Sequence, residues 1–281
     1  MKIALKNLDE EDLEEESFVK FKSNKHKLTG KQSVTQLVSQ AGSGSDPEAK
    51  FENPDLNELS KQDFLDELIS GIKTGKEASV FLGKNSKGFV AVKMYTDLRV
   101  RSFKNDAAYR QGRFIGDTRM EKAIDQGSQK GLNAHQFLWV QEEFKQMHHL
   151  YEHGVRVPKA IAVNGLALVM EFIGDENGYP APRISDLKME KDEAQESFRQ
   201  AIQNLKRIVR SGRVHGDYST FNLLWHKEEA VVIDFPQVME IDKNRNAITF
   251  LERDVRSLCK SFMKQGVNAD ERSVMREIRA R

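Results

Sequence analysis

The stretch that decides the fold reads His215-Gly216-Asp217-Tyr218-Ser219-Thr220-Phe221-Asn222, and the run Val231-Val232-Ile233-Asp234 follows it. Two aspartates and one asparagine, spaced in this way, supply hard oxygen donors of the kind that Mg²⁺ prefers. A hairpin between Asn222 and Asp234 would bring these two side chains together, which predicts a metal site made by both. Asp217 lies further back in the loop and could receive or orient the proton of an attacking hydroxyl. Either aspartate alone is equally typical of an ordinary turn or strand end, so the ordered set carries the argument.

Two further charged residues lie upstream of this loop. Lys93 ends the apolar run Val90-Ala91-Val92, and Glu143 lies on the flank of the apolar face of a predicted helix. A lysine in such a place could hold the α- and β-phosphates of a nucleotide if a carboxylate kept it charged and aimed. The order Lys, Glu, Asp, Asn, Asp is the phosphoryl-transfer set of protein kinases.

The turn Thr74-Gly75-Lys76-Glu77 precedes a predicted hairpin and could lay backbone N–H groups over phosphates. Taken alone, it is more typical of a plain loop. A P-loop NTPase is excluded, because the glycine spacing from Gly71 is wrong, Glu77 stands where a Ser or Thr is required, and a strand rather than a helix follows.

Hydrophobic periodicity around these motifs predicts an α+β chain of two lobes. The expected elements are a short helix at 63–70, strands at 78–83 and 89–95, a helix at 134–153, a hairpin at 160–170 with a type I′ turn at Asn164-Gly165, a linker with Pro180 and Pro182, a helix at 190–210, strands at 223–225 and 230–235, and a helix at 249–265. The β-rich N-lobe with one long helix spans residues 61–173. The mainly helical C-lobe, with the catalytic and metal loops, spans residues 174–281.

Composition bounds the remaining possibilities. The chain has 281 residues and a net charge of +1, so bulk charge argues neither for nor against nucleic acid. Mean hydropathy is −0.61, and no apolar run approaches the ~18–20 residues of a membrane span. Acidic residues from Asp9 to Glu16 occupy the place of a signal peptide's apolar segment. Cys259 is the only cysteine, which excludes an internal disulfide and fits a cytoplasmic location.

Two segments are expected to lack a packed core. Residues 1–60 are polar, with a Gly-Ser-rich stretch at 42–47, and are predicted to be a disordered tail. Residues 98–130 form a long insert rich in Lys and Arg, and a loop of this length is typically functional or disordered. We expect the insert either to contact RNA or phosphate, or to fold only with nucleotide or a partner.

The motifs taken together resemble those of the RIO-type atypical serine/threonine protein kinases, over about three quarters of the chain. The matching segments are Thr74-Gly75-Lys76-Glu77-Ala78 as the phosphate-binding loop, Ala91-Val92-Lys93 with the ATP lysine, Trp139-Val140-Gln141-Glu142-Glu143 with its paired glutamate, Val169-Met170-Glu171-Phe172-Ile173-Gly174 as the hinge, Pro180-Ala181-Pro182 after it, His215 to Asn222 and Ile233-Asp234 as the catalytic and metal loops, and Leu251-Glu252-Arg253-Asp254-Val255 as the closing helix.

The resemblance implies that ATP and Mg²⁺ bind between the lobes, with adenine bonded to the hinge segment around Met170, at the backbone of Glu171 and Ile173. It further implies Asp217 as proton acceptor and Asn222 and Asp234 on the metal. In this family the residue at Asp234 can become an aspartyl-phosphate, so ATP hydrolysis is expected beside protein phosphorylation. Members in other cells act in maturation of the small ribosomal subunit, which makes a pre-ribosomal partner an expectation by analogy.

The chain departs from the family pattern at several positions. Lys73 stands where Ser is usual, Gly216 where Ala is usual, and Phe235-Pro236 follow Asp234 where small residues are common. Because proline fixes φ and lacks an N–H, the metal loop is expected to be stiffer here. None of these changes removes a catalytic group.

Only about fifteen residues separate Asp234 from the predicted helix at 249–265, too few for an activation segment with a substrate platform. This spacing favours autophosphorylation, ATPase switching or one dedicated partner. Two alternative functions remain open. One is a small-molecule phosphotransferase of the aminoglycoside- or choline-kinase type, which uses a similar His-Gly-Asp, Asn and Ile-Asp pattern. The other is a nucleotide-binding assembly scaffold without essential catalysis.

Overall fold

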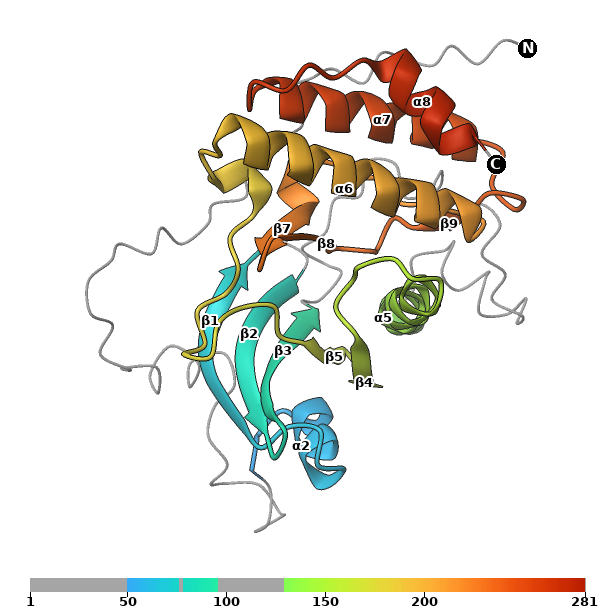
Figure 1. Ribbon diagram of the computed structural model, residues 1–281. Coiled ribbons are helices and arrows are strands. Elements are labelled where there is room, and N and C mark those ends of the chain that lie inside the picture. Colours follow the sequence, from blue (N-terminus) through green and yellow to red (C-terminus); the bar gives the residue numbers. More distant parts are fainter. Residues whose placement is uncertain (1–49, 76–77, 96–128, 281) are drawn as a thin grey trace.

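A computed structural model describes residues 50–75, 78–95 and 129–280, and these form two lobes joined by a short connection (Figure 1). The N-lobe is built on a five-stranded antiparallel sheet of strand order β1-β2-β3-β5-β4. Its strands are β1 (Glu67–Thr74), β2 (Ala78–Asn85), β3 (Gly88–Tyr95), β4 (Ala160–Asn164) and β5 (Ala167–Glu171). With the helical second lobe, this confirms the predicted α+β two-lobe fold.

The N-lobe begins with a helix that the sequence reading missed. Helix α2 (Pro54–Lys61) starts at the N-cap Asn53, whose side chain accepts the N–H groups of Asp55 and Leu56, and Pro54 suits the first turn. Leu56 is fully buried and Leu59 is 1% exposed, both in a core shared with the sheet. The predicted disordered tail at 1–60 is therefore wrong for residues 54–60. Residues 1–49 lie outside the described part of the chain.

The predicted helix at 63–70 is also wrong. Residue Asp63 has a positive φ of 60°, and from Glu67 the chain pairs with β2 as an edge strand. The amide of Asn85 donates to the carbonyl of Phe64, and the N–H of Asp66 donates to the carbonyl of Lys84 at 2.7 Å. An apolar run this short fits helix or strand equally well, and pairing with the neighbouring strand decides between them.

The long helix α5 (Gln129–Glu152) lies beside β4 and β5 and contains the predicted 134–153 helix except for its last residue. Val140 and Met147 are fully buried, whereas Phe137 and Tyr151, which we expected on the same face, are 46% and 43% exposed. The buried face is therefore rotated from the prediction. Glu143 is only 2% exposed, and it lies on the buried side rather than on its flank.

The predicted hairpin at 160–170 is present as β4 and β5, but its turn differs. Asn164 still pairs with Ala167, so the two turn residues are Gly165 and Leu166, and only Gly165 has a positive φ. A type I′ turn at Asn164-Gly165 is therefore wrong. A carboxylate oxygen of Asp55 accepts the N–H of Leu166 at 2.9 Å, which fastens α2 to this turn.

The C-lobe is mainly helical, with α6, α7 and α8 stacked side by side in Figure 1. Its elements are η3 (Ile184–Asp186), α6 (Lys191–Arg210), β6 (Arg213–Val214), η4 (Thr220–Asn222), β7 (Leu223–His226), β8 (Glu229–Val232), β9 (Met239–Glu240), α7 (Ala247–Met263) and α8 (Glu271–Arg279). Leu251, Val255, Leu258 and Phe262 are buried, as the periodicity of the predicted final helix requires. Helix α8 was not predicted.

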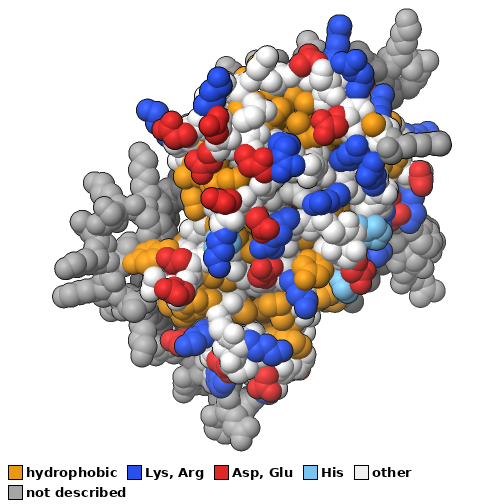
Figure 2. Space-filling model, in the orientation of Figure 1, with side chains coloured by type: hydrophobic (Ala, Val, Ile, Leu, Met, Phe, Trp, Pro, Cys, Tyr) orange, Lys and Arg blue, Asp and Glu red, His pale blue; other side chains and the backbone are white. Residues whose placement is uncertain are grey.

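Charge on the C-lobe surface follows the helix ends. Helix α6 carries Asp192 and Glu193 in its first turn and Arg207 and Arg210 in its last, which complements the helix dipole. Figure 2 shows the face of the molecule that carries this helix layer. On this face, within the described residues, charges of both signs are interspersed.

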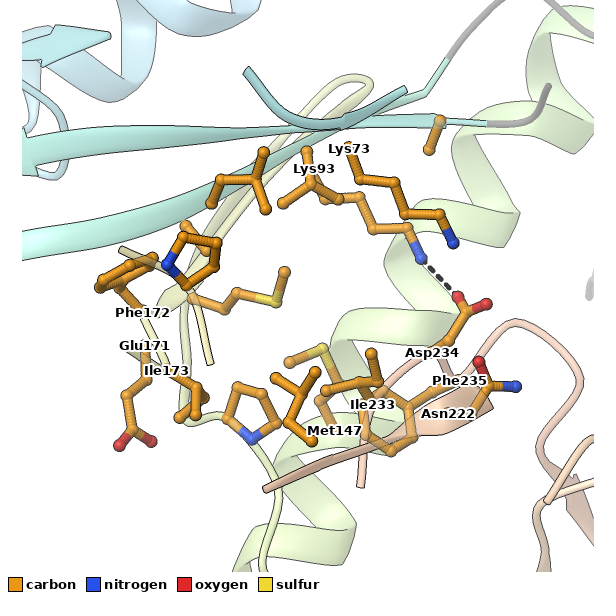
Figure 3. Close-up of a pocket in the computed structure, with 18 of the residues that line it drawn as sticks. Lys73, Lys93, Met147, Glu171, Phe172, Ile173, Asn222, Ile233, Asp234 and Phe235 are labelled. Atoms are coloured by element: carbon orange, nitrogen blue, oxygen red, sulfur yellow. Dashed lines mark hydrogen bonds and ion pairs between the residues drawn. The ribbon is translucent and has the colours of Figure 1, made fainter. Parts of the chain in front are cut away.

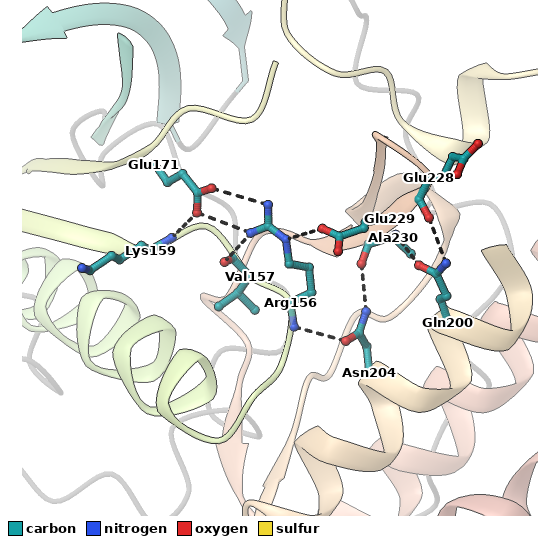
Figure 4. A network of polar contacts seen from close by, with 9 residues as sticks. All are labelled: Arg156, Val157, Lys159, Glu171, Gln200, Asn204, Glu228, Glu229 and Ala230. Atoms are coloured by element: carbon teal, nitrogen blue, oxygen red, sulfur yellow. Dashed lines mark hydrogen bonds and ion pairs between the residues drawn. The ribbon is translucent and has the colours of Figure 1, made fainter. Parts of the chain in front are cut away.

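Arg156 links the two lobes (Figure 4). Its guanidinium lies 3.4 Å from a carboxylate oxygen of Glu171, at the end of β5, and 3.0 Å from one of Glu229, at the start of β8. Its backbone N–H donates to the side chain of Asn204 on α6, and its carbonyl accepts the N–H of Val232. One residue thus ties the sheet of the N-lobe to the hairpin that carries the predicted metal ligand.

Several expectations concern residues that the structure does not describe. Residues 76–77 and 96–128 lie outside the described part of the chain. The predictions for Lys76, for Glu77 and for residues 98–128 of the basic insert therefore fall on residues that the structure does not describe. The last two residues of that insert begin α5. Among the helices in the described ranges, none combines the length and apolar character that crossing a membrane requires.

Candidate active site

The charged residues predicted to act together meet between the lobes. The Nζ of Lys93 lies 2.8 Å from Oε1 of Glu143 and 2.8 Å from Oδ1 of Asp234. Lys93 lies on β3, Glu143 on α5 and Asp234 in the loop after β8. Glu143 is 50 positions and Asp234 is 141 positions after Lys93 in the sequence. The predicted convergence of Lys93, Glu143 and Asp234 is confirmed by these distances. Figure 3 shows the contact between Lys93 and Asp234.

Burial and charge set the protonation states of this cluster. Burial works against the charged form of Lys93, but the two carboxylates raise the pKa of its ammonium above the ordinary value. Burial alone would raise the pKa of Asp234, yet the Lys93 ammonium lowers it to about 2. The pKa of Glu143 is raised, because burial outweighs the attraction of Lys93. A cationic lysine and an ionised Asp234 therefore face each other at the cleft.

Asp234, which lines the cleft, has a strained backbone conformation. Asp234 has a φ of 67°, a left-handed conformation that is uncommon outside glycine. The strand predicted at 230–235 consequently ends at Val232, because an extended strand cannot continue through this residue. The next N–H, that of Phe235, donates to Oε1 of Glu143 at 3.3 Å. Strain of this kind, held by its surroundings, is typical of functional positions.

The loop predicted to be catalytic brings Asp217 and Asn222 together. The amide nitrogen of Asn222 donates to Oδ2 of Asp217 at 3.0 Å and to its carbonyl at 2.9 Å. The amide oxygen of Asn222 is thereby turned away from Asp217, and Figure 3 shows the side chain at the same end of the cleft as Asp234. The N–H of Ile233 donates to the carbonyl of Asn222 at 3.0 Å, so the β7–β8 hairpin joins the two loops.

Asp254 on α7 anchors the backbone of this loop, a role that was not predicted from the sequence. Its carboxylate accepts the N–H of Gly216 at 2.8 Å and the N–H of Tyr218 at 3.0 Å. Arg253, the preceding residue, donates to the carbonyl of Gly216. Asp254 is 1% exposed, and burial raises its pKa to about 7. The motif Leu251 to Val255 was the available signal, but its partner cannot be read from sequence.

His215 is buried behind the loop. Its ring packs edge-on against Tyr218 and Phe235, with centroids 5.4 and 5.7 Å away. Its Nδ1 accepts the N–H of Asp217 at 3.3 Å. Burial lowers the pKa of His215 to about 4, so the ring is neutral at physiological pH. It supports the position of Asp217 by packing and one hydrogen bond, and it carries no charge there.

The cleft has a charged end and an apolar end (Figure 3). At the apolar end the lining includes Val80, Ala91, Met147, Met170, Ile173, Pro180, Ala181, Leu224 and Ile233. The predicted hinge residues Met170, Glu171 and Ile173 all line it, as do Gly75, Lys93, Glu143, Asn222 and Asp234. Thr74 is exposed and Asp217 does not line the cleft. Lys73, Phe172 and Arg183 line it without having been predicted.

Backbone groups of the hinge are already partly engaged. The N–H of Glu171 donates to the carbonyl of Lys159 at 2.8 Å, and the N–H of Ala181 donates to the carbonyl of Ile173 at 2.9 Å. The Glu171 side chain points away from the cleft toward Arg156. Among the described residues, the N–H of Ile173 makes no backbone hydrogen bond. This N–H can therefore donate to a ligand in the cleft, which Ile173 lines.

These residues fit a magnesium-bound nucleotide. A planar apolar ring suits the end lined by aliphatic side chains, and an anionic chain suits the end where the Lys93 ammonium lies. The donor set of Asp234 and Asn222 is one carboxylate and one amide oxygen. Mg²⁺ commonly takes one or two protein carboxylates and completes its shell with water and phosphate. Within the described ranges no cluster of three or more His, Cys, Asp or Glu side chains could form a closed metal cage.

Comparison with known proteins gives a consistent result. The model of the RIO domain family matches residues 79–274. A RIO-type serine/threonine-protein kinase Rio1 from Haloferax volcanii is 36% identical over 217 residues, covering 76% of this chain and 70% of that protein. The corresponding Rio1 kinase of Methanocaldococcus jannaschii is 31% identical and covers 76% and 69%. The human serine/threonine-protein kinase RIO1 is 29% identical, and the match spans 36% of its length.

Solved structures agree on the fold. The Rio2 kinase of Chaetomium thermophilum superposes with a TM-score of 0.55 at 23% identity, covering 75% of this chain and 61% of that one. A second structure, the complex of that kinase with ADP, Mg²⁺ and phosphoaspartate, gives a TM-score of 0.57 at 20% identity over 86% and 72%. At these identities the comparison shows a common fold.

Proposed function

The chain belongs to the RIO domain family, and from that premise we propose that it transfers the γ-phosphoryl group of Mg²⁺-bound ATP. The acceptor is a protein Ser or Thr, including its own, or Asp234, whose aspartyl-phosphate is then hydrolysed. The observation that carries this proposal is the Lys93 ammonium held at 2.8 Å by both Glu143 and Asp234. The names of the relatives and the phosphoaspartate in the Rio2 complex support it.

Each residue has a distinct part in this chemistry. The apolar end of the cleft accepts adenine, with the N–H of Ile173 as its backbone donor. Lys93 binds the α- and β-phosphates, and Glu143 aims it. Asn222 and Asp234 hold Mg²⁺, which neutralises charge on the phosphates when bound. Asp217, held by Asn222 and flanked by Gly216 and Tyr218, which Asp254 anchors, accepts the proton of an attacking hydroxyl.

The segment after Asp234 restricts the kind of protein substrate. Between Asp234 and the start of α7 at Ala247 the chain forms only β9 and turns. An activation segment does not fit in this interval, so an extended peptide lacks its usual platform. We therefore propose autophosphorylation, ATPase cycling or one dedicated partner. The basic insert at 98–130 is the segment that we propose for contact with RNA or a pre-ribosomal particle, and a cytoplasmic location belongs to the same proposal.

The test is incubation with γ-labelled ATP, followed by treatment with hydroxylamine. An acyl phosphate at Asp234 is cleaved by hydroxylamine, whereas phosphoserine and phosphothreonine survive. We expect label that depends on Mg²⁺ and is abolished by EDTA. Lys93→Ala and Asp234→Ala should each lower label and phosphate release by at least ~100-fold, as for other losses of electrostatic stabilisation. Normal turnover in both variants would refute the proposal.

The same assay separates the alternatives. Asp217→Ala should keep ATP binding and lose transfer to Ser or Thr. A scaffold without essential catalysis predicts normal biological activity for that variant. A small-molecule phosphotransferase predicts ADP release that depends on an added sugar or amino alcohol. Neither outcome is expected here.

A further inference from the structure

Lys73 lines the cleft but has no role in the proposed reaction described above. In the strand register Lys73 of β1 lies opposite Val80 of β2, and Val80 lies opposite Lys93 of β3. Residues directly opposite each other on neighbouring strands project from the same face of a sheet. Lys73 and Lys93 therefore project from one face, separated by a single strand, and all three residues line the cleft.

A local irregularity helps to aim this side chain. The β1–β2 register shifts between Gly71 and Lys73, which marks a bulge immediately before the lysine. Bulges of this kind redirect side chains and are common beside active sites. Gly75 of the predicted phosphate-binding loop follows two residues later and also lines the cleft. Lys73 thus stands where β1 passes into that loop.

The side chain extends toward the reacting end of the cleft. Figure 3 shows the Lys73 and Lys93 ammonium groups at the same end, both toward Asp234. The positive charge of Lys73 contributes to the lowered pKa of Asp234. Lys93 is already bonded to Glu143 and Asp234. A phosphoryl group approaching Asp234 would therefore meet two cations from different strands.

We propose that Lys73 binds the terminal phosphate of the nucleotide and accompanies the phosphoryl group as it moves onto Asp234. The bond between the γ-phosphorus and the β–γ bridging oxygen breaks, a bond from the Asp234 oxygen to phosphorus forms, and ADP leaves with the bridging oxygen. Lys73 makes no bond to phosphorus and acts by charge and hydrogen bonding. This inference rests on the proposed function and adds a phosphate-binding residue to it.

The test is equilibrium binding, independent of turnover. Wild type, Lys73→Ser and Lys73→Arg are titrated calorimetrically, in Mg²⁺, with the non-hydrolysable triphosphate AMP-PNP, with ADP and with adenosine. We expect Lys73→Ser to weaken AMP-PNP about tenfold, the order expected from one charge-assisted contact to phosphate. Adenosine affinity should stay within about twofold, which also shows that the variant is folded. Lys73→Arg should recover most of the loss.

Lys84→Ser is the matched control, because Lys84 is an exposed lysine on β2 of the same sheet. It removes the same charge away from the cleft and should leave all three affinities unchanged. Equal losses in Lys73→Ser and Lys84→Ser, or an unchanged preference for AMP-PNP over adenosine in Lys73→Ser, would overturn the inference. If wild type failed to bind AMP-PNP, the proposed function itself would fail. The two failures are therefore distinguishable.

Discussion

The N–H of Gly216 donates to Oδ2 of Asp254 at 2.8 Å, across 38 positions of sequence. The other oxygen of the same carboxylate accepts the N–H of Tyr218 at 3.0 Å. Asp217 lies between these two anchored residues, so a side chain of α7 fixes the backbone on both sides of the proposed proton acceptor. Asp254 is not among the residues that line the cleft, so we expect it to act as a positioning residue.

Asp254→Asn should loosen the loop while leaving the cleft intact. An asparagine has one acceptor oxygen, so its amide nitrogen would face one of the two N–H donors. We expect a loss of about 1–3 kcal/mol in the free energy of unfolding, the usual result of leaving a buried donor unpaired. Phosphoryl transfer should fall about tenfold or more, while adenosine affinity is retained.

Glu252→Gln is the control for this variant, since Glu252 is an exposed neighbour on the same helix. Calorimetric binding and single-turnover transfer are measured on both proteins. A parallel loss of adenosine affinity and transfer in Asp254→Asn would point to general damage, against a positioning role.

Two buried groups should give opposite pH dependence of stability. His215 has a folded pKa of about 4, below its ordinary 6.5, so between these values the unfolded chain binds a proton that the folded chain lacks. Its contribution to stability is lost as pH falls through this window. Asp254 has a folded pKa of about 7, above its ordinary 3.8, so its contribution is lost as pH rises between them.

Single variants should reveal each effect. For each group the free energy of unfolding changes by at most about 1.4 kcal/mol per pH unit. Urea unfolding at pH 5.0 and 6.5 is compared for wild type, His215→Phe and Asp254→Asn. On acidification His215→Phe should gain stability relative to wild type, and Asp254→Asn should lose it. Parallel curves for all three proteins would show that neither group titrates as the structure requires.

Arg156 is expected to strengthen the connection between the lobes. In Arg156→Met the links to Glu171 and Glu229 are lost, but the backbone contacts with Asn204 and Val232 remain. Because the guanidinium is only 28% exposed, we expect a loss of about 1 kcal/mol in unfolding free energy, at the upper end for partly exposed pairs. Guanidinium- or urea-induced unfolding measures it.

Arg199→Met provides the comparison, because Arg199 pairs with Glu196 within one exposed helical turn. That pair joins no separate elements and should contribute little to stability. Equal effects of the two substitutions would mean that bridging the lobes gives Arg156 no special role.

The sequence predicted the centre of the site because its parts are local. Asp217 and Asn222 lie on one loop, a two-stranded hairpin leads to Asp234, and Lys93 lies near the end of a recognisable strand. Each of these relations depends on short spacings and hydrophobic patterns. The convergence of Lys93, Glu143 and Asp234 followed from the order of motifs, and the geometry confirms it.

What the sequence could not predict depends on distant partners. The run with Leu65 and Leu68 fits a helix until β2 is there to pair with it. Helix α2 has an N-cap at Asn53 and a proline in its first turn, but it has only eight residues, too few to be stable without the sheet and the turn at Leu166. Asp254 reads as one polar residue in an amphipathic helix, because the N–H groups it accepts lie far away in sequence.

Gly216→Ala tests whether this chain's departure from the family's usual alanine is tied to its own loop geometry. Gly216 has a φ of 85°, where an L-residue is strained, and an added Cβ would lie 2.9 Å from the carbonyl oxygen of Gln237 and 3.1 Å from the methyl of Met239. Gln237 lies just after Phe235-Pro236, the other departure. Because proline limits how far that backbone can move, we expect a loss of about 1–3 kcal/mol and slower phosphoryl transfer.

Gly71→Ala is the matched substitution, since a Cβ there meets nothing within 4 Å and the residue lies in β1. It should leave stability within about 0.5 kcal/mol of wild type, as for an uncrowded site. The decisive comparison is Gly216→Ala in wild type and in a Pro236→Ala background, by urea unfolding. If Pro236 holds the turn at Gln237 rigid, the destabilisation caused by the alanine should be smaller in that background. An equal loss of stability in both backgrounds would show that Pro236 does not add to the effect. The positive φ of Gly216 would then be sufficient to explain why alanine destabilises this position.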